Sequence, residues 1–137
     1  IDAAPEPAIA FSWHGGEPTL AGLDFYRTAV ALQKKHARPG TRIANGMQTN
    51  GTLLDADWGR FLAEERFSVG ISLDGPAEIH DRQRVNKGGR PSFRQSMRGY
   101  EILRRYGVST DVLCVVGSHN AGRPGEVFGF FKSIEAA

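Results

Sequence analysis

Polar residues and glycines recur at four points of the sequence where an apolar segment ends. His14-Gly15-Gly16-Glu17 follows the first segment, Gln48-Thr49-Asn50-Gly51 the second, Ser72-Leu73-Asp74-Gly75-Pro76 the third and Gly117-Ser118-His119-Asn120 the fourth. Glycines let a backbone approach a ligand closely, and a carboxylate such as that of Glu17 can hold an ammonium group. Together these groups suit the recognition of a small zwitterion.

A further set of charged residues follows the third apolar segment. His80 and Asp81 lie in the next loop, and Arg84 comes shortly after them. An arginine can clamp a carboxylate through two parallel hydrogen bonds, so Glu17 and Arg84 offer complementary charges for the two ends of an amino acid. Each motif alone also has a purely structural interpretation, because Gly15-Gly16 suits a tight turn and an acidic residue suits the start of a helix.

The elements that carry these residues alternate between strands and helices. Apolar segments bounded by turn residues predict strands over 8–13, 42–48, 67–73 and 111–116. Helical spacing predicts helices over 21–36 and 55–65, a third that begins at an N-cap Ser92 and reaches Tyr106, and a last one from Val127 that the chain end interrupts. Strands that are continuously apolar are typical of a parallel sheet covered by helices, so we predict the α/β class. In such folds ligands bind at the carboxyl ends of the strands, where the polar segments lie.

Composition and charge exclude several classes of protein. The chain has 137 residues, 40% of them hydrophobic, and a net charge of +2 with the two signs interspersed. No apolar stretch approaches the length of a membrane helix, the N-terminal residues do not form a signal peptide, and the charge pattern does not indicate nucleic-acid binding. We therefore expect a cytoplasmic protein. The basic loop from Arg82 to Arg90 is interpreted as solvated.

The sequence lacks the common catalytic motifs and a metal-binding pattern. It contains no dinucleotide fingerprint, Walker A loop, zinc-protease helix or serine nucleophile elbow. The four histidines lack ligand spacing, and the single Cys114 cannot form a cysteine-based metal site from this chain alone. Because Cys114 falls within a predicted strand, we interpret it as a small buried hydrophobic residue.

Taken in order, the polar segments resemble the radical S-adenosylmethionine (SAM) enzymes that carry a SPASM extension, and most of all the anaerobic sulfatase-maturating enzymes. The likeness runs from about residue 11 to about residue 132, through WHGGEPTL (13–20), QTNG (48–51), SLDGP (72–76), IHD (79–81) with Arg84, and LCVV (113–116). It implies four consecutive βα units of a (βα)6 barrel with the helices outside, and it makes residues 1–137 the central part of one radical SAM domain.

The resemblance also implies a cofactor site. Gly15, Gly16 and Glu17 are implied to bind the amino group of SAM, and Ser72 and Arg84 its carboxylate. Two further residues complete the implied set, Gln48 in the pocket wall and Val116 near the adenine.

The family's other essential parts are expected outside these residues. The three-cysteine loop that binds the [4Fe–4S] cluster would precede Ile1, and the SPASM domain and the proposed catalytic Asp would follow Ala137. We therefore expect these residues alone to be inactive, with no metal ligand and the catalytic residue unknown. The implied activity of the whole enzyme is oxidation of a sulfatase Cys or Ser to formylglycine, with flavodoxin or ferredoxin as electron donor. Two alternatives stay open: another SPASM enzyme that modifies peptides, and a non-catalytic α/β binding module.

Overall fold

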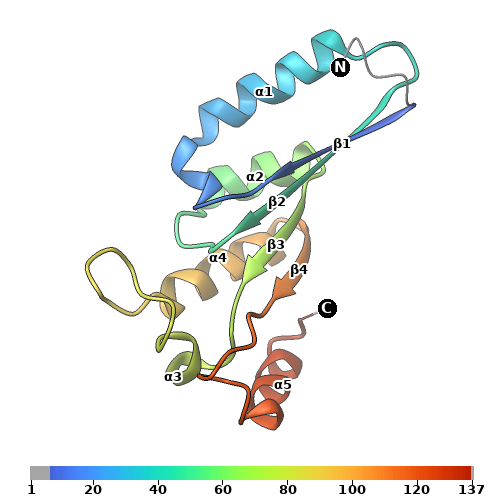
Figure 1. Cartoon of the computed structure of the whole chain (residues 1–137). Coiled ribbons are helices and arrows are strands. Elements are labelled where there is room, and N and C mark those ends of the chain that lie inside the picture. The colour runs from blue at the N-terminus through green and yellow to red at the C-terminus, as the bar shows by residue number, and fades with distance from the viewer. Residues whose placement is uncertain (1–6, 137) are drawn as a thin grey trace.

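The computed structural model describes residues 7–136 and alternates strands with helices (Figure 1). The strands are β1 (Ala8–Trp13), β2 (Arg42–Thr49), β3 (Ser68–Ser72) and β4 (Ser109–Leu113). The helices are the short 3-10 helix η1 (Pro18–Ala21) and α1 (Leu23–His36), α2 (Ala56–Glu64), α3 (Ala77–His80), α4 (Phe93–Arg105) and α5 (Pro124–Ser133). The predicted α/β class is confirmed, and every predicted strand and helix is present with somewhat shifted ends.

The four strands form one parallel sheet in the order β1-β2-β3-β4. Across successive strands Ser12 pairs with Gly46, Gly46 with Ser68, and Gly70 with Asp111. Each pair of consecutive strands is joined through at least one helix, as a parallel pairing requires. The carboxyl ends of all four strands therefore lie at the same edge of the sheet, which brings the polar segments to one side of the molecule.

The main core lies between the sheet and helices α1, α2 and α4. Its buried members are Tyr26, Val30, Met47, Leu54, Trp58, Phe61, Leu62, Phe67, Val69, Ile71, Leu73, Tyr100, Leu103 and Val108. Every helix that faces the sheet contributes aromatic or branched side chains, so burial of apolar surface stabilises the stack of sheet and helices. Within residues 7–136, no helix is long and apolar enough to cross a membrane.

The strands are not buried along their whole length. Exposure alternates along β1 and β4, and neither strand contains a fully buried residue. In the described part of the chain the core lies on one face of the sheet, and the pleat turns every second side chain to the other face. Met47 thus enters the core while the next residue, Gln48, is exposed. This second face, called the open face below, also carries Ser12 and Asp111.

The predicted strand over 111–116 is shorter and begins earlier. β4 ends at Leu113, because the backbone N–H of Val115 leaves the sheet and donates to the Asp74 carboxylate over 2.9 Å. Cys114 therefore lies beyond the strand and is half-buried, with its Sγ 3.5 Å from Nδ2 of Asn120. The last helix also differs from its prediction: it ends at Ser133, before the chain end.

Helix α4 begins where predicted, but Ser92 does not cap it with its side chain. Asp81 does so instead: its Oδ1 accepts the N–H of Ser92 over 2.9 Å and the N–H of Phe93 over 2.8 Å. The Ser92 hydroxyl donates to the carbonyl of Arg84 over 2.6 Å. The cap thus comes from a residue outside the helix and ties the loop that carries Arg84 to the start of α4.

A close glycine contact seats α4 against the turn that follows β2. A Cβ added to Gly99 would lie only 2.2 Å from the carbonyl oxygen of Gly51. Gly51 itself has φ of +74°, and its own Cβ would lie 2.5 Å from Cδ1 of Ile71. Glycine is therefore required at both positions, and the pair determines where the polar turn after β2 lies.

The substitution Gly99→Ala is expected to lower the free energy of unfolding by about 1–3 kcal/mol, because the added methyl group must displace backbone rather than a side chain. Gly129→Ala is the matched control: it also lies within a helix, but nothing surrounds its Cβ position within 4 Å. That variant should be neutral or up to about 1 kcal/mol more stable. Urea unfolding followed by circular dichroism measures both, and equal effects would contradict the close contact.

Candidate functional site

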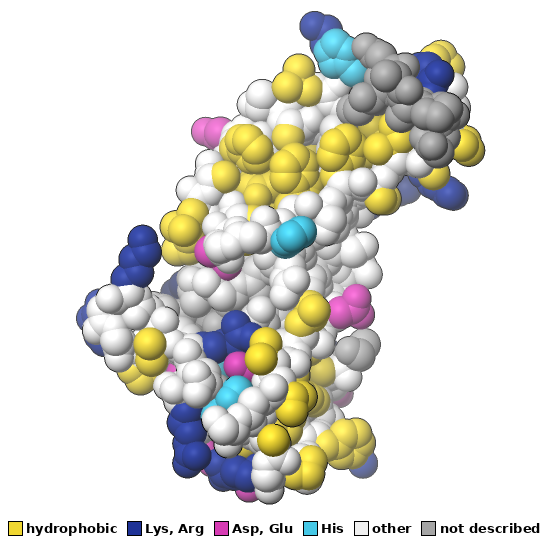
Figure 2. Space-filling view, in the orientation of Figure 1, with side chains coloured by type: hydrophobic (Ala, Val, Ile, Leu, Met, Phe, Trp, Pro, Cys, Tyr) yellow, Lys and Arg dark blue, Asp and Glu magenta, His cyan; other side chains and the backbone are white. Residues whose placement is uncertain are grey.

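The carboxyl edge of the sheet and the loops beyond it form the candidate site. Figure 2 looks onto the open face and shows Lys or Arg, Asp or Glu, and His side chains meeting in its lower half, near the ends of β3 and β4. On this face Gln48 is exposed, whereas Ser72 is only 6% exposed. Both lie near the carboxyl ends of their strands, so the sheet places two of the predicted residues on one face.

The loop after β1 presents open backbone. Gly15 has φ of +92° and Gly16 φ of +56°, and no atom lies within 4 Å of the Cβ position of either residue. Such left-handed backbone favours glycine, and the absence of a side chain leaves the peptide groups accessible to a ligand. The predicted use of this loop as a cradle for a charged group is consistent with that geometry.

The Glu17 carboxylate is engaged with the protein itself. Its Oε1 accepts the backbone N–H of Thr19 over 3.0 Å and also the Thr19 hydroxyl. The same oxygen accepts the Thr49 hydroxyl over 2.7 Å, and Oε2 accepts the backbone N–H of Asn50 over 2.8 Å. Glu17 therefore caps η1 and joins the glycine loop after β1 to the end of β2.

Asp74 is the centre of the site. The sequence analysis placed it in the polar segment after the third strand but assigned it no role in the site. The residue is 1% exposed. Its carboxylate accepts Nε of Arg84 over 2.7 Å, Nη2 of Arg84 over 3.1 Å and the N–H of Val115 over 2.9 Å. The signal that could have found it was the combination of a carboxylate directly after a buried strand and an arginine in the next loop.

The surroundings of Asp74 keep it charged. Burial by itself raises the pKa of the Asp74 carboxyl, but the hydrogen bonds from Arg84 and Val115 and the positive charge of Arg84 outweigh burial and lower the pKa below its usual value. Asn120 adds a hydrogen bond from Nδ2 to the Asp74 carbonyl over 3.2 Å. His119 is also buried here, with Nε2 3.6 Å from Oδ2 of Asp74.

Arg84 connects this cluster to a cavity. The cavity has a volume of about 710 Å³, and both Glu17 and Arg84 line it, together with Asn50, Thr52, Val85 and Ser92 among others. A guanidinium has five N–H donors, and Asp74 engages two of them. In the part of the chain that the structure describes, the other three donate to no residue. The predicted pair of opposite charges is thus brought to one cavity.

The remaining predicted residues do not line that cavity. Gln48 and Ser72 lie on the open face, Gly15 and Gly16 are exposed in the loop after β1, and Val116 is 76% exposed. Within residues 7–136, no group of three or more His, Cys, Asp and Glu side chains is arranged to hold a metal ion. Cys114 belongs to no such group, and burial raises the pKa of its thiol.

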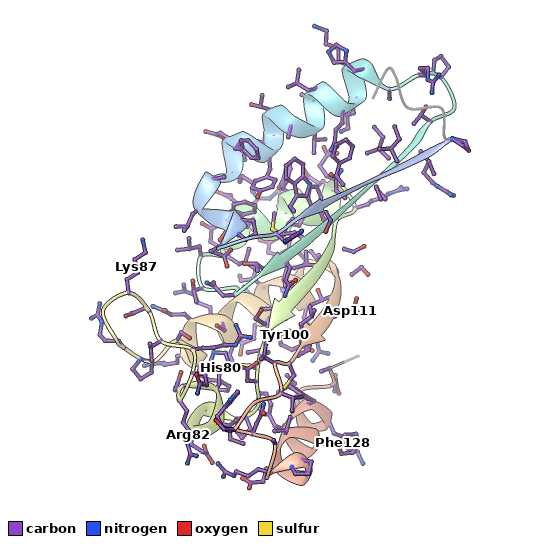
Figure 3. The ribbon with its side chains drawn as sticks, in the orientation of Figure 1. His80, Arg82, Lys87, Tyr100, Asp111 and Phe128 are labelled. Atoms are coloured by element: carbon purple, nitrogen blue, oxygen red, sulfur yellow. The ribbon has the colours of Figure 1, made fainter. Side chains whose placement is uncertain are left out.

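His80, the last residue of α3, is buried next to Asp74 (Figure 3). Its Nδ1 accepts the backbone N–H of Asp74 over 3.3 Å, so Nε2 carries the proton and donates to Oγ of Ser92 over 3.2 Å. Both ring nitrogens are thus satisfied in the neutral form. Burial and the charge of Arg84 lower the pKa of His80, which favours that form.

Comparison with known proteins assigns the family. The profile of the radical SAM superfamily matches residues 1–130. The chain belongs to the radical SAM superfamily. It is 45% identical over 135 residues to a serine-type anaerobic sulfatase-maturating enzyme of Bacteroides thetaiotaomicron, a match that covers 98% of this chain and 32% of that protein. It is 44% identical over 123 residues to a cysteine-type enzyme of Clostridium perfringens, with 90% of this chain and 33% of that protein covered.

Solved structures of the same group match the fold of this radical SAM chain. Native anSMEcpe with bound AdoMet superposes with a TM-score of 0.95 and 41% identity, over 98% of this chain and 36% of that one. Native anSMEcpe with bound AdoMet and Kp18Cys peptide gives a TM-score of 0.93 and 42% identity, over 95% and 36%. The four parallel strands and their helices therefore match the core of these enzymes. The chain spans about a third of the length of the curated relatives it matches.

Protonation of His80 is expected to destabilise the fold. The folded-state pKa of His80 lies below its usual value, so the unfolded chain binds the proton more readily, and stability falls as the pH drops through the ordinary histidine pKa of about 6.5. Between pH 7.5 and pH 5.5, the His80→Gln variant should therefore lose less free energy of unfolding than the wild-type protein. His14→Gln, at an exposed position, should keep the full loss. Urea titrations at the two pH values test this, and equal losses in all three proteins would refute it.

Proposed function

We propose that these residues are the SAM-binding central part of a longer radical SAM enzyme that oxidises a Cys or Ser of a sulfatase to formylglycine. Family membership, 45% identity to a serine-type and 44% to a cysteine-type sulfatase-maturating enzyme support the proposal. The observation that carries it is the cavity lined by Glu17 and Arg84, because SAM bears an ammonium and a carboxylate group on its methionine part.

The chain's own residues fit the methionine part of the cofactor. The free N–H groups of Arg84 suit its carboxylate. Ser72 does not line that cavity, so its assignment as a second donor to the carboxylate is made from the resemblance alone. The open peptide groups of Gly15 and Gly16 suit its ammonium group, and the bonds that Glu17 makes hold that loop in place while its negative charge stays nearby. Gln48 and Val116 are assigned to the pocket wall and the adenine, in line with the resemblance.

A [4Fe–4S] cluster requires three thiolates from the protein, and this chain has a single cysteine. The residues present do not fit the cluster, so its ligands are assigned to parts of the enzyme outside this chain. Bound SAM supplies a 5′-deoxyadenosyl radical once an electron reaches it. What these residues do is bind the cofactor, orient it, and exclude water from its charged end.

The proposed substrate is a peptide segment of a sulfatase with a Cys or Ser. One relative is named as a serine-type and another as a cysteine-type enzyme, and one matching structure contains a Cys peptide. The proposed electron donor is a small redox protein such as flavodoxin or ferredoxin.

The direct test is anaerobic turnover of the full-length protein with reconstituted iron and sulfide, SAM, dithionite and two synthetic sulfatase peptides that carry Cys or Ser. Formation of 5′-deoxyadenosine together with a formylglycine peptide, detected by mass spectrometry, is expected. Release of 5′-deoxyadenosine without peptide oxidation would assign the protein to another radical SAM reaction. A protein that does not bind SAM would overturn the proposal.

Glu17→Gln is expected to weaken SAM binding by about tenfold, because the amide NH2 replaces one acceptor oxygen and leaves a donor of the η1 cap or of Asn50 without a partner. Glu64→Gln is the control, since Glu64 is an exposed acidic residue at the end of α2. Isothermal titration calorimetry of the full-length variants with SAM measures the effect. An unchanged affinity in the Glu17 variant would remove Glu17 from the site.

A further inference from the structure

We propose that Asp74 is a positioning residue for SAM binding: it holds one edge of the Arg84 guanidinium so that the other edge faces the methionine carboxylate. The inference rests on the proposed function and adds a residue to the set that the resemblance implies. Asp74 acts through Arg84 and does not itself touch the methionine carboxylate.

The geometry of the ion pair fixes the direction of Arg84. Two bonds of 2.7 and 3.1 Å from Nε and Nη2 to the two carboxylate oxygens form the bidentate arrangement, which defines the plane of the guanidinium. The Arg84 side chain is 24% exposed, whereas that of Asp74 is 2% exposed. Arg84 therefore contacts the buried carboxylate on one side and the cavity on the other.

Burial makes this pair more than a surface contact. An unpaired carboxylate in such a place would be costly to bury, so Asp74 retains its charge only with Arg84 and the N–H of Val115 as donors. Removing the charge of Asp74 would leave Arg84 without its main partner, and a long side chain with several rotatable bonds would then sample other directions. The expected consequence is a lower affinity for a ligand that carries a carboxylate.

Asp74 is itself held from several elements. His80 from α3 accepts its N–H, Asn120 from the loop after β4 donates to its carbonyl, and Val115 donates to Oδ1. The carboxylate is thus a fixed point between β3, β4 and the loop of Arg84. A fixed anchor of this kind is what a preorganised binding arginine needs.

The test compares two ligands in the full-length protein with the Asp74→Asn substitution. The remaining amide oxygen of that variant can still accept the N–H of Val115, but its NH2 group faces the Arg84 donors and the bidentate pair is lost. SAM carries the methionine carboxylate, and 5′-methylthioadenosine lacks it. We expect the affinity for SAM to fall about tenfold and the affinity for 5′-methylthioadenosine to stay within about twofold.

A double-mutant cycle with Arg84→Lys separates positioning from a general structural effect. If Asp74 acts through Arg84, the Asp74 substitution should cost little further SAM affinity once Arg84 is lysine. Asp111→Asn serves as the control, because Asp111 is an exposed carboxylate on β4 (Figure 3). It should leave both affinities unchanged.

The outcomes distinguish this inference from the proposed function. Failure of the wild-type protein to bind SAM contradicts the proposed function. Two results contradict the positioning role alone, provided that the wild-type protein binds SAM. In the first, the Asp74→Asn variant keeps its affinity for SAM. In the second, its affinities for SAM and for 5′-methylthioadenosine fall by the same factor. Should that variant unfold, Asp74→Glu replaces it: the charge remains but lies one methylene further out, and the same selective loss of SAM affinity is expected. Wild-type SAM affinity in that variant would overturn the inference.

Discussion

The buried ion pair between Asp74 and Arg84 is the interaction on which the candidate site depends. The carboxylate of a residue that is only 1% exposed is stable only when donors surround it, and here they come from the loop after α3 and from the chain beyond β4. Satisfying that one charge therefore draws two separate loops to the end of β3. It also ends β4 early, because the N–H of Val115 turns from the sheet to the carboxylate.

Glu17, which also lines the cavity, is likewise a carboxylate that accepts hydrogen bonds from separate segments of the chain. Its carboxylate accepts donors from Thr19, Thr49 and Asn50, so it joins the end of β2 to the loop after β1. The acidic side chains of the site are thus largely occupied with protein donors. The groups left for a ligand are the open peptides of Gly15 and Gly16 and the free edge of Arg84.

The packing beneath these loops restricts where they can lie. Gly99 in α4 lies against the carbonyl of Gly51, and His80 fills the space below Asp74 with both ring nitrogens satisfied. Neither residue faces the cavity. Each restricts the conformations of a loop that does face the cavity. Short side chains and exposed backbone can therefore form a site of defined shape.

The α/β class, the order of the elements and the segments that carry polar groups could be predicted from the sequence, because hydrophobic periodicity and turn residues are local properties of the chain. The sequence also singled out Glu17 and Arg84 as opposite charges. Tertiary structure decided how those charges are used. The central place of Asp74, the cap of α4 by Asp81 and the end of β4 at Leu113 depend on partners that lie ten or more residues away in the sequence. The one-sided burial of the strands depends on which face of the sheet the helices cover. Hydrogen bonds between such distant groups have no local pattern, so only the folded chain specifies them.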